Sequence, residues 1–154
     1  MGENVAQTEE GVIDVDATMK SAMDWLEHFA DCVRAQDFDG GRALFAPQAR
    51  GFGTVVERAV GLLQLEEGQW RQIWPNTQDF RLIETSREVF VSADGSQACV
   101  LALWESEARA DEASGRPAFH RRGRCTLLLE RADGSPYGWR AIHSHFSKRP
   151  TGEV

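Results

Sequence analysis

Four long β-like segments fill the second half of the chain and limit the folds that it can adopt. They cover residues 78–91, 97–109, 117–131 and 137–147. The links between them, SADGS, DEASG and ADGSP, are rich in turn-forming residues. Strands that follow one another through such short links usually pair with their sequence neighbours. The pattern therefore predicts an antiparallel meander.

Three helical segments are predicted ahead of these strands. Apolar residues at three- and four-residue steps indicate an amphipathic helix that is capped by Asp16 and runs to about Gln36. A shorter helix, capped by Asp39 and ended by Pro47, follows it. The glycine-broken stretch ARGFGTVVERAVGLL then predicts a small hairpin. A third helix is expected over residues 66–74.

Helices followed by a long curved sheet predict an α+β fold, in which the three N-terminal helices cover one face of an antiparallel sheet. Such a sheet encloses a cone-shaped space with a mouth. With 154 residues, of which 42% are hydrophobic, the chain suits one domain with its own core, placed at residues 16–150. Residues 1–15 lack periodicity and are expected to be a flexible arm, and residues 151–154 a tail.

The order of the elements resembles the cone fold of the nuclear transport factor 2-like superfamily. The ending RADGSPYGWRAIHSHFSKRP is similar to the last hairpin of its SnoaL-like group and of the association (hub) domain of calcium/calmodulin-dependent kinase. There a D-G turn leads into W-x-x-[IV]-H-x-H-x-S and a nearby proline. The matching residues are Asp133, Gly134, Trp139, Ile142, His143, His145, Ser147 and Pro150. The resemblance implies the fold, whereas the same fold hosts enzymes, binding modules and oligomerisation hubs.

Net charge and cysteine content indicate which partners and which cellular compartment to expect. A net charge of −7 argues against nucleic acid or an anionic membrane as the main partner. The chain has no apolar run of about 18 residues, and its acidic beginning is unlike a signal peptide. Three cysteines without a C-x-x-C pair, Cys32, Cys99 and Cys125, suggest neither a disulfide framework nor a zinc knuckle. We therefore expect a cytoplasmic protein.

The pair His143 and His145 is the first candidate site, because residues two apart on a strand point to the same side. A metal would need further ligands, and only Glu153 follows in the tail, so we expect no metal and no cofactor. In one interpretation both rings pack in the sheet and form hydrogen bonds with neighbours or a partner subunit. In the other, at least one ring reaches the cavity as a catalytic proton carrier or polar contact, with Ile142 and Phe146 on the opposite side.

Arginines and aromatic residues provide the other candidates for ligand binding. Arg122 and Arg124 share one strand face with His120, and Arg121 lies opposite. If the first face lines the cone, two guanidinium groups would favour a carboxylate or another anionic ligand; the alternative is a solvated strand end. Apolar walls of the cavity are predicted from three aromatic residues: Phe52, Trp74 and Trp104.

The leading hypothesis for function is the binding of a small, partly apolar organic molecule in the cone. Its enzymatic form would resemble a ketosteroid isomerase or a polyketide cyclase. The resemblance to ketosteroid isomerases implies an aspartate base with a tyrosine donor, but the only tyrosine, Tyr137, lies beside a Pro-Gly turn, and no such pair can be assigned. The alternative is a non-catalytic oligomerisation or accessory domain. Apolar residues on both faces of QACVLALW predict a homodimer through the outer face of the sheet.

Overall fold

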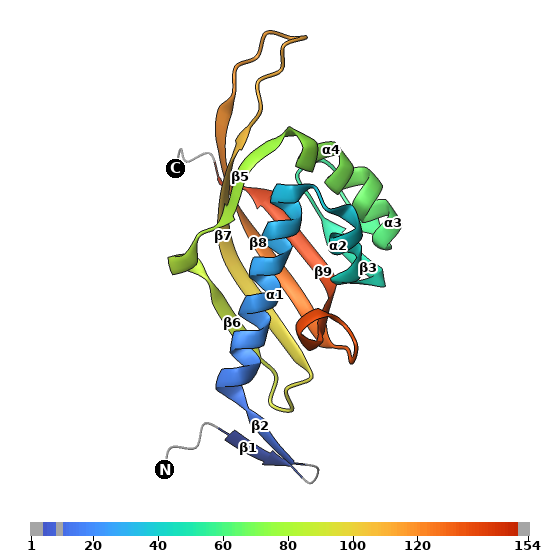
Figure 1. The fold of residues 1–154 in the computed structure, drawn as a ribbon, viewed down its shortest axis with the longest axis vertical. Coiled ribbons are helices and arrows are strands. Elements are labelled where there is room, and N and C mark those ends of the chain that lie inside the picture. Colours follow the sequence, from blue (N-terminus) through green and yellow to red (C-terminus); the bar gives the residue numbers. More distant parts are fainter. Residues whose placement is uncertain (1–4, 9–10, 151–154) are drawn as a thin grey trace.

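One long helix lies along one face of a curved sheet, and shorter helices cover the upper part of the same face (Figure 1). This computed structural model describes the backbone of residues 5–8 and 11–150, and side chains from residue 13 onward. The α+β cone predicted from the order of the elements is confirmed. The other face of the sheet carries no helix in the described part of the chain.

Both early helices are capped two residues before the predicted positions. Helix α1, Val15–Ala35, is capped by Asp14, whose side chain accepts a hydrogen bond from the Ala17 backbone N–H at 3.1 Å. Helix α2, Phe38–Ala43, is capped in the same way by Asp37, which accepts from Gly40. Asp16 and Asp39 therefore lie inside the first turns, where a carboxylate still interacts favourably with the helix dipole. The prediction of an aspartate cap is right for both helices, but each cap lies two residues earlier than predicted.

The next segments lead from α2 through a hairpin to the third helical region. Strand β3, Phe45–Phe52, contains Pro47, which therefore lies in a strand and does not mark the end of the helix. Strand β4, Ala59–Val60, pairs with β3 as the predicted hairpin. The third helical region begins earlier than expected, with α3 at Leu62–Leu65. A π-helical turn at Glu66–Trp70, α4 at Arg71–Ile73 and a 3₁₀ turn at Trp74–Asn76 complete it.

The main sheet has the strand order β4-β3-β9-β8-β7-β5 within the described residues, and β6 also pairs with β7. Its later strands are β5 Thr77–Leu82, β6 Glu88–Val91, β7 Gln97–Ala108, β8 Phe119–Arg131 and β9 Trp139–Lys148. A 3₁₀ turn at Glu84–Ser86 divides the segment that was predicted as a single first strand. The sheet is mixed, because β3 pairs parallel with β9 across almost 100 residues of chain. A short-link meander could not predict that pairing.

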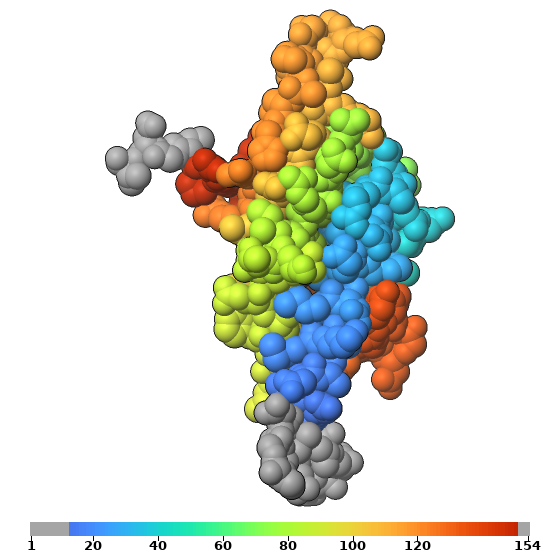
Figure 2. All heavy atoms as spheres, turned by 60° about the vertical axis from the view of Figure 1, so that its left-hand side comes forward, coloured from blue at the N-terminus to red at the C-terminus, as the bar shows by residue number. Residues whose placement is uncertain are grey.

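The two ends of the long axis are formed by hairpins. The β7–β8 hairpin, orange at the top of Figure 2, projects beyond the rest of the molecule. At the other end β1, Val5–Thr8, pairs with β2, Gly11–Asp14, directly before α1. An extended hairpin thus occupies part of the segment expected to be a loose arm, and the flexibility of that arm stays a prediction. Residues 1–4, 9–10 and the tail 151–154 lie outside the described residues.

The core lies between α1 and the concave face of the sheet. Trp25, Leu26 and Phe29 from α1 are at most 2% exposed, and they pack in one cluster with Leu127 and Leu129 of β8. Aromatic rings continue this core toward α2–α4. Their large buried area stabilises the contact between helix and sheet.

Candidate functional site

A cavity opens between α1, the third helical region and the concave face of the sheet. It holds about 610 Å³ of space between atoms, including its opening to solvent. Most of that space is narrow, so a small ligand suits it better than a large one. The described residues that line it are Phe29, Val33, Phe52, Thr54, Leu65, Gln69, Trp70, Ile73, Trp74, Thr77, Phe80, Trp104, Ser106, Arg121, Ser144, Phe146 and Lys148.

The walls of the cavity are mainly aromatic. Trp70 and Trp74 stack with centroids 4.8 Å apart, and Phe29 packs against Trp74 at 6.0 Å. From the sheet, Phe80 lies 6.2 Å from Trp104. Of the three residues predicted as walls, Trp74 and Trp104 are buried in the cavity wall. Phe52 also borders the cavity, but it is 42% exposed and packs on the two histidines of the outer face. Such walls can bind an apolar body through area burial and ring contacts.

The π-helical turn holds a loop at the edge of the cavity. The Gln69 side chain is 7% exposed and accepts hydrogen bonds from the backbone N–H groups of Val55 (2.8 Å) and Val56 (3.1 Å). Its amide nitrogen donates to Thr54 Oγ1 at 2.9 Å. Gly53 allows this approach, because a Cβ there would overlap the Gln69 amide. Nothing in the sequence pattern singles out Gln69, because the π turn at Glu66–Trp70 has the residue pattern of an ordinary helix.

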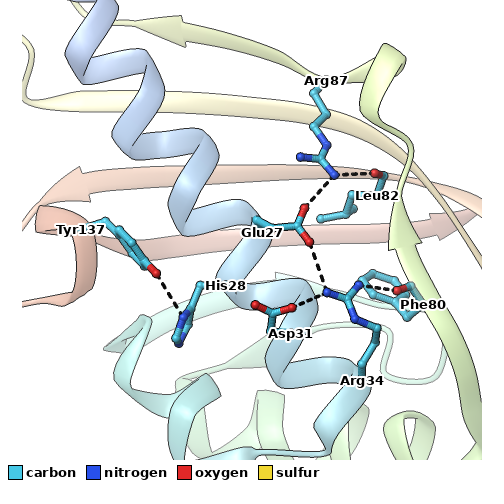
Figure 3. A network of polar contacts seen from close by, with 8 residues as sticks. All are labelled: Glu27, His28, Asp31, Arg34, Phe80, Leu82, Arg87 and Tyr137. Carbon is cyan, nitrogen blue, oxygen red and sulfur yellow. Dashed lines mark hydrogen bonds and ion pairs between the residues drawn. The ribbon is translucent and has the colours of Figure 1, made fainter.

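Arginines fasten α1 over β5 and β6 (Figure 3). Arg87 Nη2 donates to Glu27 Oε1 of the helix at 2.9 Å and to the Leu82 carbonyl at 2.7 Å. Arg34 Nη1 donates to the Phe80 carbonyl at 2.7 Å, and its other amino group contacts both Glu27 and Asp31. These bonds fix the helix against the strand that supplies one cavity wall.

The only tyrosine of the chain lies on the other flank of α1. The Tyr137 hydroxyl is 3.3 Å from His28 Nδ1, and the two rings meet edge to face (Figure 3). Neither residue lines the cavity. Tyr137 therefore cannot act as the oxyanion donor that a ketosteroid isomerase mechanism would need in that space.

Arg121 and Ser106 form a polar spot on the sheet wall of the cavity. They are partners across β7 and β8. Arg121 Nη2 donates to Thr77 Oγ1 at 2.7 Å, while its Nε is buried without a hydrogen-bond partner among the described residues. The Ser106 hydroxyl is also buried without a partner there. Burial, and next the charge of Arg116, lower the pKa of Arg121.

The face of β8 that was predicted to line the cone points away from it. Arg122 and Arg124 are exposed on the outer face of the sheet, so the prediction that they line the cavity is wrong. The buried residues Cys125, Leu127 and Leu129 fill the concave face, and strict alternation carries that face back to Arg121. The sequence contained this signal in the apolar residues at odd positions.

The histidine pair also faces outward. Ser144 and Phe146 line the cavity, whereas His143 and His145 do not, so the expectation that a histidine reaches the cavity is wrong. The cause is a β-bulge: His143 pairs with Leu128, and Ala141 already pairs with the next residue, Leu129. The extra residue reverses the alternation of β9 after the buried Ala141.

On the outer face the histidines form a small cluster with Phe52. The Phe52 ring meets both imidazoles edge to face with centroids 5.5 Å apart. His143 Nδ1 lies 3.0 Å from the Arg50 carbonyl oxygen and can donate to it. This geometry is that of the structural interpretation, in which the rings are satisfied by neighbours on the sheet.

Three further findings concern the described residues. Among the described residues, no group of three His, Cys, Asp or Glu side chains is placed to hold a metal ion. No helix in that part of the chain combines the length and the apolar character needed to cross a bilayer. The cavity itself has no carboxylate, imidazole or phenol among its described lining residues.

An aromatic-walled cavity between helices and a curved mixed sheet defines a protein of the nuclear transport factor 2-like class. The chain belongs to the SnoaL-like domain family, whose model matches residues 22–151. No curated protein matches the chain.

Solved structures with the same fold differ widely in what their names describe. A nuclear transport factor 2-like superfamily protein from Salmonella enterica serovar Typhimurium has a TM-score of 0.73 at 17% identity, covering 91% of this chain and 96% of that one. The CaMKII hub from S. rosetta gives 0.66 at 18% identity, with 84% and 95% coverage. A ketosteroid isomerase-like protein from Erwinia carotovora atroseptica gives 0.63 at 17% identity, with 88% and 95% coverage. At these identities the likeness shows the fold alone.

Proposed function

We propose that this protein binds a small, partly apolar organic molecule in the cavity of the cone. The observation that carries the proposal is the combination of aromatic walls with buried polar groups that lack partners in the described part of the chain. Apolar pockets with a few convergent polar groups are the usual form of small-molecule sites. The walls supply affinity, and the polar groups select the ligand.

Binding without proton transfer fits the cavity better than isomerase or cyclase chemistry. Proton abstraction next to a carbonyl needs a base within hydrogen-bond reach of the substrate. The described lining residues include no Asp, Glu, His or Tyr. We therefore favour a binding role, and His143 and His145 take no part in it.

Filling the cavity tests this proposal. A mixture of small aromatic fragments, including indole, benzamide and benzoate, is screened by saturation-transfer NMR against the protein. Ile73→Trp replaces an aliphatic side chain with an indole ring at a cavity-lining position, and Gln72→Trp is the matched control at the exposed neighbour. Fragment signals should disappear in Ile73→Trp and persist in Gln72→Trp. Signals that are equal in both variants would place binding elsewhere and contradict the proposal.

A second proposal concerns assembly: we infer that a second copy of the chain covers the outer face of the sheet. Phe90 (56% exposed) and Leu103 (48% exposed) lie there beside the partly buried Cys99, Leu101 and Leu128. An apolar strip of this kind usually marks an interface. A homodimer would be consistent with the similarity to a protein named as a hub.

Sedimentation tests the homodimer. The wild type should sediment at twice 17.2 kDa at micromolar concentration, and Phe90→Glu together with Leu103→Glu should yield a folded monomer. Arg122→Gln, also on the outer face but charged in the wild type, serves as a control that should leave the dimer intact. A wild type that stays at 17.2 kDa at high concentration contradicts the dimer without touching the ligand proposal.

The cysteines support our placing the protein in the cytoplasm. All three are free thiols in the described structure. Burial raises the pKa of Cys125 to about 12, and burial followed by the charges of Asp37 and Asp31 raises that of Cys32 to about 11. Free, protonated thiols are consistent with a reducing compartment.

A further inference from the structure

Arg121 is a partly buried cation whose charge has no counter-ion among the described residues. No ion pair includes it, whereas the next residue, Arg122, contacts Glu105 at 3.4 Å. Its one hydrogen bond goes to the neutral hydroxyl of Thr77. Because a guanidinium group remains charged in proteins, the uncompensated charge costs free energy until an anion approaches.

The surroundings of Arg121 orient its remaining donors. Thr77 Oγ1 donates its own proton to the Ile73 carbonyl at 2.7 Å, so a lone pair faces Arg121 Nη2. This bond holds the guanidinium plane and leaves Nε free of protein partners in the described structure. Ser106, directly opposite on β7, has a hydroxyl that also lacks a partner there.

One kind of group satisfies both unpartnered atoms. A hydroxyl hydrogen and an Nε–H are both donors, so the missing partner is an acceptor with room for two bonds. A water molecule could accept them, but it would leave the charge uncompensated. A carboxylate accepts both bonds and neutralises the charge, and guanidinium groups bind carboxylates through paired, charge-assisted hydrogen bonds.

We propose that the ligand of the cavity carries a carboxylate, which binds to Arg121 and Ser106 while its apolar body lies between the aromatic walls. This inference rests on the proposed binding function and specifies the chemical class of its ligand. Lys148 also lines the cavity and adds a second positive charge there. The site is on the concave face, and it does not involve Arg122 or Arg124.

The test uses benzoate and benzamide, which share a ring and differ in charge, with binding measured by calorimetry at neutral pH. The wild type should bind benzoate roughly tenfold or more tightly than benzamide, as expected for hydrogen bonds to a charged group. Arg121→Gln should abolish that preference, because it should weaken benzoate much more than the neutral benzamide. Arg121→Lys, which keeps the charge without the planar fork, should retain part of it. Arg122→Gln, one residue away on the outer face, should change neither affinity.

Thermal melts and a second variant keep the test independent of folding defects. Arg121→Gln removes an unpaired charge, so its melting temperature without ligand should not fall. Ser106→Ala removes only the second donor and should weaken benzoate several-fold. Equal binding of benzoate and benzamide to the wild type would overturn the carboxylate inference and leave the binding function standing. Binding of neither probe, together with no effect of Ile73→Trp on any fragment, would overturn both.

Discussion

The two faces of the same sheet have almost opposite environments, although the strands supply apolar residues to both. On the concave face Val100, Leu127 and Leu129 are fully buried under α1. On the outer face Leu128 is only partly buried, and Leu103 is 48% exposed. Coverage by the helices, and not the residue type, separates a core from a surface here. Apolar content alone therefore does not reveal which face is the inside.

Two neighbouring arginines of β8 differ in the same way, because only the one on the outer face has a carboxylate partner among the described residues. Arg122 on the outer face lies 3.2 Å from His120 Nε2 and near Glu105, in a network that solvent can screen. Arg121, its neighbour in sequence, lies at the cavity without a carboxylate partner among the described residues. Neighbouring residues of a strand point to opposite faces of the sheet. One arginine is therefore an ordinary surface charge, and the next is a candidate binding group. The following predictions test how far this difference between the faces extends.

The largest difference in the free energy of unfolding is expected between substitutions of two adjacent leucines of β8. Leu129→Ala on the concave face should lower the free energy of unfolding by about 3 kcal/mol, because it leaves a cavity in the core. Leu128→Ala on the outer face should cost about 1 kcal/mol or less in the monomer. Denaturant unfolding at low protein concentration measures both. Equal losses would mean that the outer face is as well covered as the inner one.

A smaller loss of stability is expected when either of two carboxylates that contact arginines is replaced by an amide. Glu66, 5% exposed in the helix layer, accepts hydrogen bonds from Arg42 and Arg71 at 2.7 Å. Burial alone would raise its pKa, but the hydrogen bonds and charges of the two arginines lower it overall from the ordinary 4.5. Glu66→Gln should therefore cost about 2 kcal/mol at neutral pH. Glu105→Gln, on the outer face beside Arg81 and Arg122, should cost less.

The sign of the pH dependence follows from the lowered pKa of Glu66. A carboxyl group with a lowered pKa in the folded state stabilises the protein above 4.5, and this contribution is lost as the pH falls through the folded value. Melting curves from neutral to acidic pH should thus show the wild type approaching Glu66→Gln. If the melting temperatures of the wild type and Glu66→Gln differed by the same amount down to the lowest pH, the ion pairs of Glu66 would not be the source of the difference.

The smallest effect should come from the outward histidines. His145→Gln should change neither stability nor benzoate binding, and His143→Gln should cost about 1 kcal/mol at most, through its bond to the Arg50 carbonyl. Calorimetry with benzoate and thermal melts measure both quantities. A tenfold loss of benzoate affinity in either variant would contradict the placement of these rings on the outer face.

The sequence by itself determined the order of the elements and the family. The three- and four-residue spacing fixed α1, and the turn residues fixed where β7, β8 and β9 begin and end within a few positions. It could also have identified Arg121, since β8 alternates regularly from the buried Leu129 back to that residue. Local pattern suffices in these cases, because period and turn chemistry act between neighbours along the chain.

Only the tertiary structure decided the parallel pairing of β3 with β9 and the direction of the histidines. Both depend on contacts between residues far apart in sequence. The bulge at Ile142 inserts one residue into β9, and one residue is enough to exchange the two faces of a strand. No local signal marks that insertion, because its cause is the fit of Trp139 and Ala141 into the core on one side of the bulge and of Ser144 and Phe146 against the cavity on the other.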